Sequence, residues 1–277
     1  MKNYLKLVNF EFNRCVKLYF SLIGLTIVSQ LIAVFVESRN YINQMNEAVY
    51  QNKIPKAQFL SETGEMSMFW VANSSWFLLP IIISVTAVLF YSFYIWYVEW
   101  MGKNTFIYRL LMLPTTRITV FWSKLTTIAL MIFGLVSIQL ILLLVESQLL
   151  KLLVSSDIRL DLSLQQISEA TYYLSLFIPQ SFLSFIVYYG TGFVFLFLGF
   201  TTILFERSFR FKGIIMGIGF SIVLFLVFLS PIIVDTVLGS NWFYPVELLI
   251  AEVIAGLLVI ALSSWMSHYL LNKKITV

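Results

Sequence analysis

The chain has 277 residues, of which 60% are apolar or aromatic and 12% are charged, and its mean hydropathy is +0.89. Soluble proteins carry about 25% charged residues, so this sequence could not cover its apolar side chains with a polar surface. These numbers exclude a soluble enzyme, a nucleic-acid-binding module and a disordered chain. With one cysteine and one histidine, an intrachain disulfide and a Cys/His metal site are excluded as well. The composition predicts an integral membrane protein.

The first residues, 1–17, predict an amphipathic helix. Apolar side chains such as Tyr4, Val8 and Phe12 fall on one helical face, and lysines fall on the other. We expect this helix to lie in the membrane interface, separate from the first span. The alternative is that it only extends the first span into the cytoplasm.

Six stretches are long and apolar enough to cross ~30 Å of hydrocarbon as helices, which takes about 20 residues. They predict an all-α integral membrane protein in which residues 1–277 form a single transmembrane domain. The outer segments 37–75 and 146–175 are too short to be convincing separate domains, and Pro179 is expected to divide an outer piece from the fourth span. The predicted spans are 18–36, 76–98, 125–145, 182–205, 213–234 and 246–269.

The basic residues are divided unevenly between the two sides of these spans. With the N-terminus inside, thirteen of the eighteen Lys and Arg residues lie on the inner side, together with only three of the fourteen acids. By the positive-inside rule, this excess predicts that both termini are cytoplasmic. The net charge of +4 therefore indicates an orientation, not a nucleic-acid partner.

A row of small residues follows one face of the fifth predicted span. Gly213, Gly217 and Ser221 are spaced four residues apart, which suits close contact between helices. Two uses of this row stay open: packing within the six-helix bundle, or an interface between two copies of the chain.

Motifs of catalytic sites are absent from the sequence. It contains no G-x-x-x-x-G-K-[ST] loop for ATP phosphates, no G-x-S-x-G and no H-E-x-x-H. No acid lies in the middle of a predicted span, where proton-driven carriers often place one. Glu146, Glu247 and Glu252 lie toward the outer ends, where we expect them to be solvated. Glu252, the deepest of the three, is also a candidate for the mouth of a transport path.

A short apolar segment lies between the second and third spans. Residues 105–113 are compatible with a helix, with Thr105 as its cap and Pro114 at its end. Nine residues cover only about 13 Å as a helix, so the segment cannot cross the bilayer. It must bury its apolar side chains either in the membrane surface or in a groove on a cytoplasmic partner.

The chain around this segment resembles a known family. Glu99-Trp100-Met101-Gly102-Lys103, then Tyr108-Arg109-Leu110-Leu111-Met112-Leu113-Pro114, Arg117 and Lys124, are similar to a pattern of ATP-binding-cassette (ABC) exporters. In permease subunits of their type-2 family, an acid ends span two, a Leu-rich coupling helix closes with Leu-Pro, and basic residues precede span three. The layout of six spans resembles the family over almost the whole chain, and the local motif covers about 26 residues.

The resemblance implies a permease that is not itself an enzyme. ATP and magnesium would bind a separate ATPase subunit, and no cofactor is expected on this chain. Two permeases, identical or related, would pair in a bacterial cell membrane. Movement of the coupling helix would pass into span two through Glu99 and Trp100. The expected contacts with the ATPase are Thr105, Phe106, Ile107, Tyr108, Arg109, Leu110, Leu111, Met112, Leu113, Pro114 and Arg117.

The resemblance implies a transport path at the interface between two permeases, lined mainly by spans two and five. Phe90, Phe93 and Tyr94 of span two are candidate path residues, and so is Glu252 near the outer end of span six. The aromatic side chains suit an amphipathic or hydrophobic cargo such as a peptide toxin, an antimicrobial peptide or a drug. The alternative is that these aromatic side chains face lipid.

Two other function classes compete with an exporter. An ion-coupled carrier or channel without an ATPase predicts ion-coordinating groups inside the membrane and inverted repeats, and neither is visible in the sequence. A membrane enzyme would need a nucleophile-base pair or a metal cluster, which a chain with one histidine does not provide.

Overall fold

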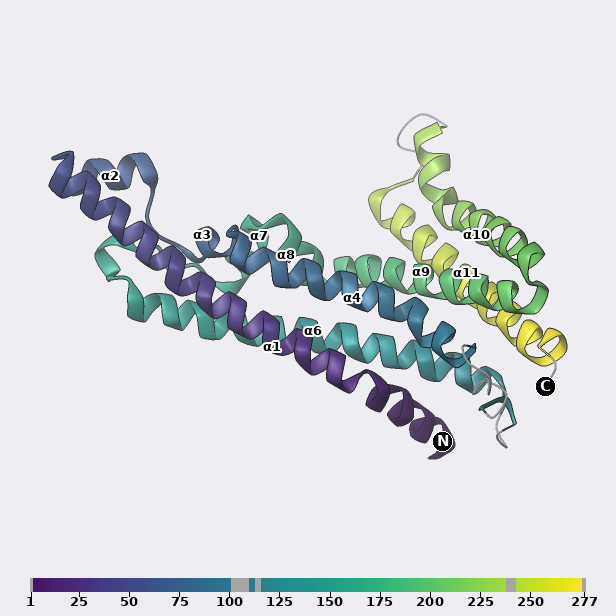
Figure 1. Cartoon of the computed structure of the whole chain (residues 1–277). Coiled ribbons are helices and arrows are strands. Elements are labelled where there is room, and N and C mark those ends of the chain that lie inside the picture. Colours follow the sequence, from purple (N-terminus) through teal and green to yellow (C-terminus); the bar gives the residue numbers. More distant parts are fainter. Residues whose placement is uncertain (1, 101–109, 113–115, 238–242, 276–277) are drawn as a thin grey trace. The chain divides into compact units, whose positions relative to one another are not determined.

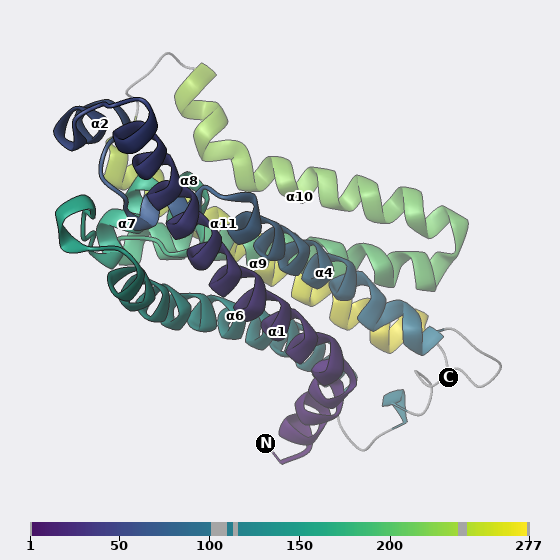
Figure 2. The same cartoon turned by 60° about the vertical axis from the view of Figure 1, so that its left-hand side comes forward.

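The computed structural model describes residues 2–100, 110–112, 116–237 and 243–275, and this part of the chain is helical (Figures 1 and 2). Strands are absent from the described residues. The long helices are α1 (Lys2–Asn46), α4 (Ser75–Trp100), α6 (Ile118–Leu153), α9 (Phe182–Phe209), α10 (Phe211–Val237) and α11 (Pro245–Tyr269). The short ones are η1 (Glu47–Gln51), α2 (Lys56–Thr63), α3 (Met68–Ala72), η2 (Ser156–Ile158), α7 (Leu164–Ala170), α8 (Tyr172–Phe177) and η3 (Leu270–Lys274).

Six helices of the described chain are long and apolar enough to cross a membrane, and each contains one predicted span. This confirms the prediction of an all-α, multi-pass membrane protein. The helices are longer than the predicted spans. α6 has 36 residues, about 54 Å at 1.5 Å per residue, against ~30 Å of hydrocarbon. No glycine or proline follows the predicted first and third spans for about ten residues, so nothing local ends these helices at the membrane surface.

The N-terminal segment differs from its expected form. α1 is one helix of 45 residues, so residues 2–17 are its first turns, and no separate helix ends before the first span. The reason lies in the sequence, because the first glycine is Gly24 and no proline precedes it. The alternative of a continuous first helix is therefore the correct one.

The chain divides into two compact units, which we describe separately. Unit 1 comprises Met1–Asn13, Leu89–Ala129 and Ser181–Val277, and unit 2 comprises Arg14–Val88 and Leu130–Gln180. In unit 2 the two predicted outer segments share one hydrophobic core with α1 and α6. We call residues 37–75 and 146–177 the cap. The buried residues of this core in the cap are Tyr41, Ala48, Phe59, Met66, Met68, Val71, Ala72, Leu150, Val154, Ile158, Ile167 and Leu174.

A pair of backbone hydrogen bonds joins the two halves of the cap. The Met66 N–H donates to the Ile158 carbonyl at 2.9 Å, and the Leu160 N–H donates to the Met66 carbonyl at 2.8 Å. Val34 and Leu143, from α1 and α6, belong to the same core. The cap is therefore built from two segments that are far apart in the sequence, and it is continuous with the helices below it.

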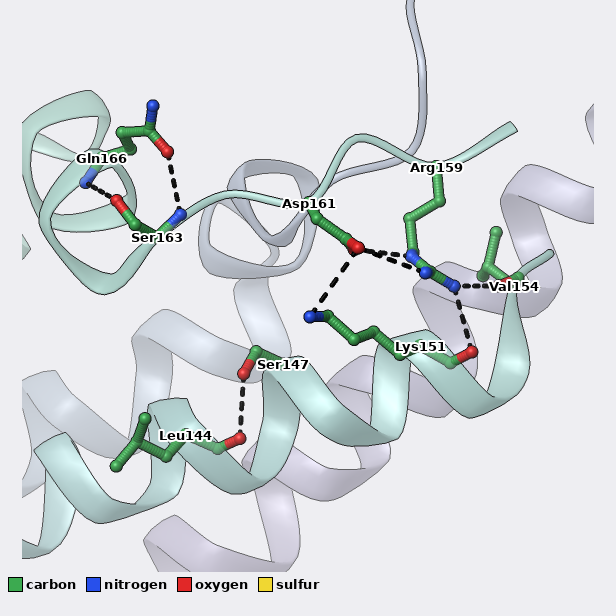
Figure 3. A network of polar contacts seen from close by, with 8 residues as sticks. All are labelled: Leu144, Ser147, Lys151, Val154, Arg159, Asp161, Ser163 and Gln166. Atoms are coloured by element: carbon green, nitrogen blue, oxygen red, sulfur yellow. Dashed lines mark hydrogen bonds and ion pairs between the residues drawn. The ribbon is translucent and has the colours of Figure 1, made fainter. Parts of the chain in front are cut away.

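A polar network ends α6 and turns the chain toward α7 (Figure 3). Arg159 Nη1 donates to the Lys151 carbonyl at 3.0 Å and to the Val154 carbonyl at 2.5 Å, and so satisfies acceptors of the last helical turn. Asp161 forms an ion pair with this guanidinium, in which Arg159 Nε donates to Asp161 Oδ1 at 2.7 Å. These hydrogen bonds from Arg159 hold the pKa of Asp161 below its usual value. Ser163 and Gln166 then form a capping box that starts α7.

In unit 1, α9, α10 and α11 pack side by side (Figures 1 and 2). A Cβ added at Gly213 would collide with the Phe205 carbonyl of α9, and one at Gly217 would lie 3.1 Å from the Thr202 carbonyl oxygen. The hydroxyls of Ser221 and Thr202 are 2.6 Å apart. The row of small residues is thus used for packing within the chain, which resolves the two uses that the sequence left open. The buried core residues of the three helices are Val194, Leu198, Leu224, Phe228 and Val259.

The fourth apolar stretch is divided as predicted. Pro179 lies between α8 and α9, and Ser181 caps α9 by accepting a hydrogen bond from the Ser184 N–H at 3.0 Å. α9 then continues without a break through residues 190–192.

Candidate functional site

The end of α4, directly before residues 101–109, carries a cluster of three buried charges. Lys124 Nζ of α6 lies 2.7 Å from Glu99 Oε1 of α4 and 2.6 Å from Glu11 Oε1 of α1. None of the three side chains is more than 1% exposed. All three belong to unit 1. The cluster therefore ties the end of α4 to α1 and to α6.

The ammonium group of Lys124 is surrounded by acceptors. Besides the two carboxylates, it donates to the Ile95 carbonyl at 3.1 Å, and it lies 5.3 Å from the centre of the Trp96 ring. Three oxygen acceptors match the three N–H donors of a lysine. The cation is consequently fully satisfied, while the cluster as a whole has two carboxylates for one ammonium group.

Sequence reasoning found Glu99 but missed its partners. In the sequence, Glu11 is one of the three acids on the inner side, and Lys124 is one of the basic residues before span three. The signal in the sequence is the spacing, because Glu11 follows Leu7 by four residues and Val8 by three and so shares their helical face. The structure buries both of these apolar side chains. A buried carboxylate is stabilised by a nearby cation, and the fold brings Lys124 to Glu11.

A second set of contacts holds the last turn of α4 from the side of α9. The Tyr97 hydroxyl donates a hydrogen bond to Glu206. The Arg207 guanidinium lies 4.8 Å from the centre of the Tyr97 ring and 5.6 Å from that of the Trp100 ring. Arg207 Nη2 is also 3.9 Å from Glu206 Oε1. Trp100, predicted as a transmission residue, is therefore in contact with α9.

The predicted coupling segment lies mostly outside the described residues. This holds for Thr105, Phe106, Ile107, Tyr108, Arg109, Leu113 and Pro114. Within the described part, Leu110 and Leu111 are buried by the chain itself, whereas Met112 is 71% exposed. A contact with an ATPase stays a prediction for all of them, and Met112 is the described residue of this segment that offers its side chain to a partner.

Arg117 has an intramolecular role. Its Nη1 donates to the Leu271 carbonyl at 2.8 Å and to the Ile275 carbonyl at 2.9 Å. A cation at these carbonyls satisfies acceptors at the end of a helix and favours its dipole. Arg117 thus fastens the end of η3 to the start of α6, while its predicted contact with an ATPase stays a prediction.

The candidate path residues lie on the surface of unit 1. Phe90, Phe93 and Tyr94 are each at least half exposed on α4, whereas Tyr91 between them is buried. Glu252 on α11 is half-buried, and its Oε2 atom is buried without a hydrogen-bond partner among the described residues. The three aromatic side chains share an outward face of α4, and both uses predicted for them, a path or a lipid contact, remain open.

Glu146 departs from its expected environment. We expected it to be solvated at the outer end of span three, but its side chain is fully buried in unit 2. Among the described residues, neither carboxylate oxygen has a hydrogen-bond partner. It lies seven residues after Gln139, on the same helical face, and Gln139 forms a reciprocal amide pair with Gln30 of α1.

The side chain of Tyr173 in the cap lies near Glu146. Burial, followed by the negative charge of Glu146, raises the pKa of this tyrosine, whose hydroxyl donates to the Ala72 carbonyl. The expectation of a solvated Glu146 was wrong because α6 continues past the predicted third span to Leu153 and the cap packs around that continuation.

Groups of three or more His, Cys, Asp or Glu side chains that could hold a metal ion are absent from the described residues. In comparisons with known proteins, the chain matches no protein family, no curated protein and no solved structure.

Proposed function

We propose that this chain is the permease subunit of a bacterial ABC exporter of the type-2 family, with both termini in the cytoplasm. Six apolar helices and the excess of basic residues on one side support it. The observation that carries the proposal is the Glu99–Lys124 ion pair of 2.7 Å. It fixes the end of α4 at the point where the segment that resembles a coupling helix begins.

In this proposal a partner ATPase binds and hydrolyses ATP, and the chain converts the movement of that partner into movement of its helices. A push on residues 105–113 reaches the end of α4 first. There Glu99 is paired with α6 and, through Lys124, with α1, while Tyr97 and Trp100 contact α9. A displacement of the segment would therefore be passed to several helices at once.

The proposed cargo is amphipathic or hydrophobic. Its support is the exposed aromatic face of Phe90, Phe93 and Tyr94 on α4, which offers large apolar surfaces and one hydroxyl. A second permease, identical or related, would cover this face and leave a path between the two subunits.

The proposal is tested by co-expression with the P-loop ATPase of the neighbouring reading frame. We expect the two proteins to purify as a complex whose ATP hydrolysis rises with candidate peptides. Met112→Asp should abolish co-purification, because it adds a charge to an exposed apolar side chain of the segment. Leu110 and Leu111 are poorer sites for this test, because substitution of a buried leucine also perturbs the fold.

Leu152→Asp is the matched control. It also adds a negative charge to an exposed apolar side chain, but near the C-terminal end of α6 and far along the chain from residues 105–113. We expect this variant to retain the complex, and both variants should insert into the membrane in normal amounts. A Met112→Asp protein that keeps full, peptide-stimulated ATPase coupling would contradict the assignment of the segment.

A second candidate function, an ion-coupled carrier without an ATPase, is favoured by Glu146. A fully buried acidic side chain with no hydrogen-bond partner among the described residues is typical of groups that bind protons or cations during transport. Transport assays in sealed vesicles distinguish the two candidate functions by the energy source that transport requires. An exporter requires ATP, whereas a carrier transports on a proton gradient alone and loses that transport in Glu146→Gln.

A further inference from the structure

The end of unit 1 at which α9 meets α10 is rich in cations. Arg210 is the single residue between the two helices, Lys212 lies in the first turn of α10, and Lys273 and Lys274 lie in η3. All four side chains are exposed. The segments lie together, because Lys274 Nζ is 5.6 Å from the centre of the Phe209 ring at the end of α9.

These cations are not neutralised by acids of the chain. Glu206 is the nearest acid in the sequence, and its carboxylate is engaged by Tyr97 and Arg207. No ion pair joins Arg210, Lys212 or the two lysines of η3 to an acidic side chain in the part of the chain that the structure describes. The cluster is therefore a positively charged surface that is open to an anion from outside the chain.

The lengths of the helices place this surface at the level of lipid headgroups. α9 has 28 residues and α10 has 27, about 40 Å each, so both extend beyond ~30 Å of hydrocarbon. The turn that joins them consequently lies where phospholipid phosphates lie. Phe211, which is 76% exposed between Arg210 and Lys212, places an aromatic ring in the same zone.

An apolar strip runs along α10 from the cation cluster. Phe211, Ile215, Ile218 and Ile222 are all exposed and are spaced by four, three and four residues, so they share one helical face. Gly219 lies beside them with open space in front of its backbone. From Phe211 to Ile222 the helix rises about 16 Å, which is close to half the ~30 Å hydrocarbon thickness.

We propose that the cation cluster and this strip form one binding site for an anionic phospholipid of the leaflet at that end of the helices. Arg210, Lys212, Lys273 and Lys274 bind the phosphate headgroup, since arginine and lysine are the usual phosphate ligands. The acyl chains lie along the strip. A soluble anion would not use the strip, and an acidic protein would not reach down it into the hydrocarbon. The site does not depend on the proposed function.

The test measures lipid binding to the purified full-length chain in detergent, by native mass spectrometry and by thermal shift. The probes are phosphatidylglycerol, phosphatidylcholine with the same acyl chains, and inorganic phosphate. We expect phosphatidylglycerol to bind and to raise the Tm, and the other two to have little effect. Lys212→Gln/Lys274→Gln should weaken phosphatidylglycerol binding roughly 25-fold, since each basic residue contributes about a factor of five.

Lys56→Gln/Lys151→Gln is the matched control, because it removes two exposed lysines of unit 2. It should bind phosphatidylglycerol as the unchanged chain does. Ile215→Ala/Ile218→Ala keeps all charges and should bind more weakly, because it shortens the apolar side chains of the strip. The Tm in phosphatidylcholine verifies that each variant is folded.

Three results would overturn the proposal. Equal phosphatidylglycerol binding by the Lys212/Lys274 variant and the control would mean that the cluster is not the headgroup site. Equal effects of phosphatidylcholine would mean that acyl chains alone are bound. A full Tm shift with inorganic phosphate, unchanged in Ile215→Ala/Ile218→Ala, would mean a site for a soluble anion and not for a lipid.

Discussion

Lys124 shows what a single buried charge requires in this protein. An ammonium group removed from water loses several kcal/mol of hydration, and only close acceptors offset that loss. Lys124 has three of them, from Glu11, Glu99 and the Ile95 carbonyl. Since the two carboxylates come from α1 and α4, the charge of Lys124 holds both of these helices against α6.

We expect Lys124→Met to destabilise the protein by about 3–5 kcal/mol, because it removes the ammonium group that pairs with two buried carboxylates. Thermal unfolding in detergent, followed by tryptophan fluorescence, measures the effect. Lys151→Met, at a lysine that is 41% exposed, is the control and should change the stability by much less.

The same logic predicts a rescue. Glu11→Gln/Glu99→Gln/Lys124→Met removes all three charges together, so it should be more stable than Lys124→Met alone. If Lys124→Met melts like the exposed-lysine control, the cluster does not hold α1, α4 and α6 together, and the proposed transmission through Glu99 loses its basis.

At the scale of helices, α9 and α10 illustrate how side-chain size sets the distance between two elements. α10 presents Gly213 and Gly217 to α9, so the backbones come within reach of Thr202 and Phe205. In a membrane, such close packing and hydrogen bonds between hydroxyls replace the hydrophobic effect as the force between helices. The pair of hydroxyls at Ser221 and Thr202 adds one of these hydrogen bonds.

We expect Gly217→Leu to destabilise the protein by about 1–3 kcal/mol, because its side chain has no room against α9. Gly219→Leu is the matched control, since it lies two residues away on the same helix with open space in front of it. The melting temperatures of the two variants in detergent, each compared with that of the unchanged chain, measure this difference. Equal melting temperatures would show that α10 does not pack on α9 through the Gly217 face.

At the scale of the whole molecule, the distribution of charge predicts a topology. If all six apolar helices cross the membrane, both termini lie on one side, and the excess of basic residues predicts that this side is the cytoplasm. The cap, with Lys56, would then face outward. This orientation underlies the proposed coupling to a cytoplasmic ATPase.

Labelling of cysteines in intact cells tests this topology. A membrane-impermeant maleimide should label Lys56→Cys and should leave Lys274→Cys unlabelled until the cells are opened. The native Cys15 is fully buried, so it contributes little background. Labelling of Lys274→Cys from outside would reverse the predicted orientation and would rule out the proposed contact with the ATPase.

The sequence alone predicted the class of the protein and the positions of its six spans. Both depend on properties that are local along the chain, namely the length of apolar stretches, the side on which Lys and Arg fall, and the helix-breaking Pro179 before α9. The lack of helix-breaking residues also accounts for the continuous α1, because no glycine or proline precedes Gly24.

The tertiary structure decided which residues meet. Glu11 and Lys124 are 113 positions apart, and Met66 and Arg159 come from different halves of the cap. No periodicity in the sequence pairs such residues, because their approach depends on how several helices pack at once. For the same reason Glu146, which has the spacing of a solvated acid at the end of a span, is buried: a segment distant in the sequence covers it.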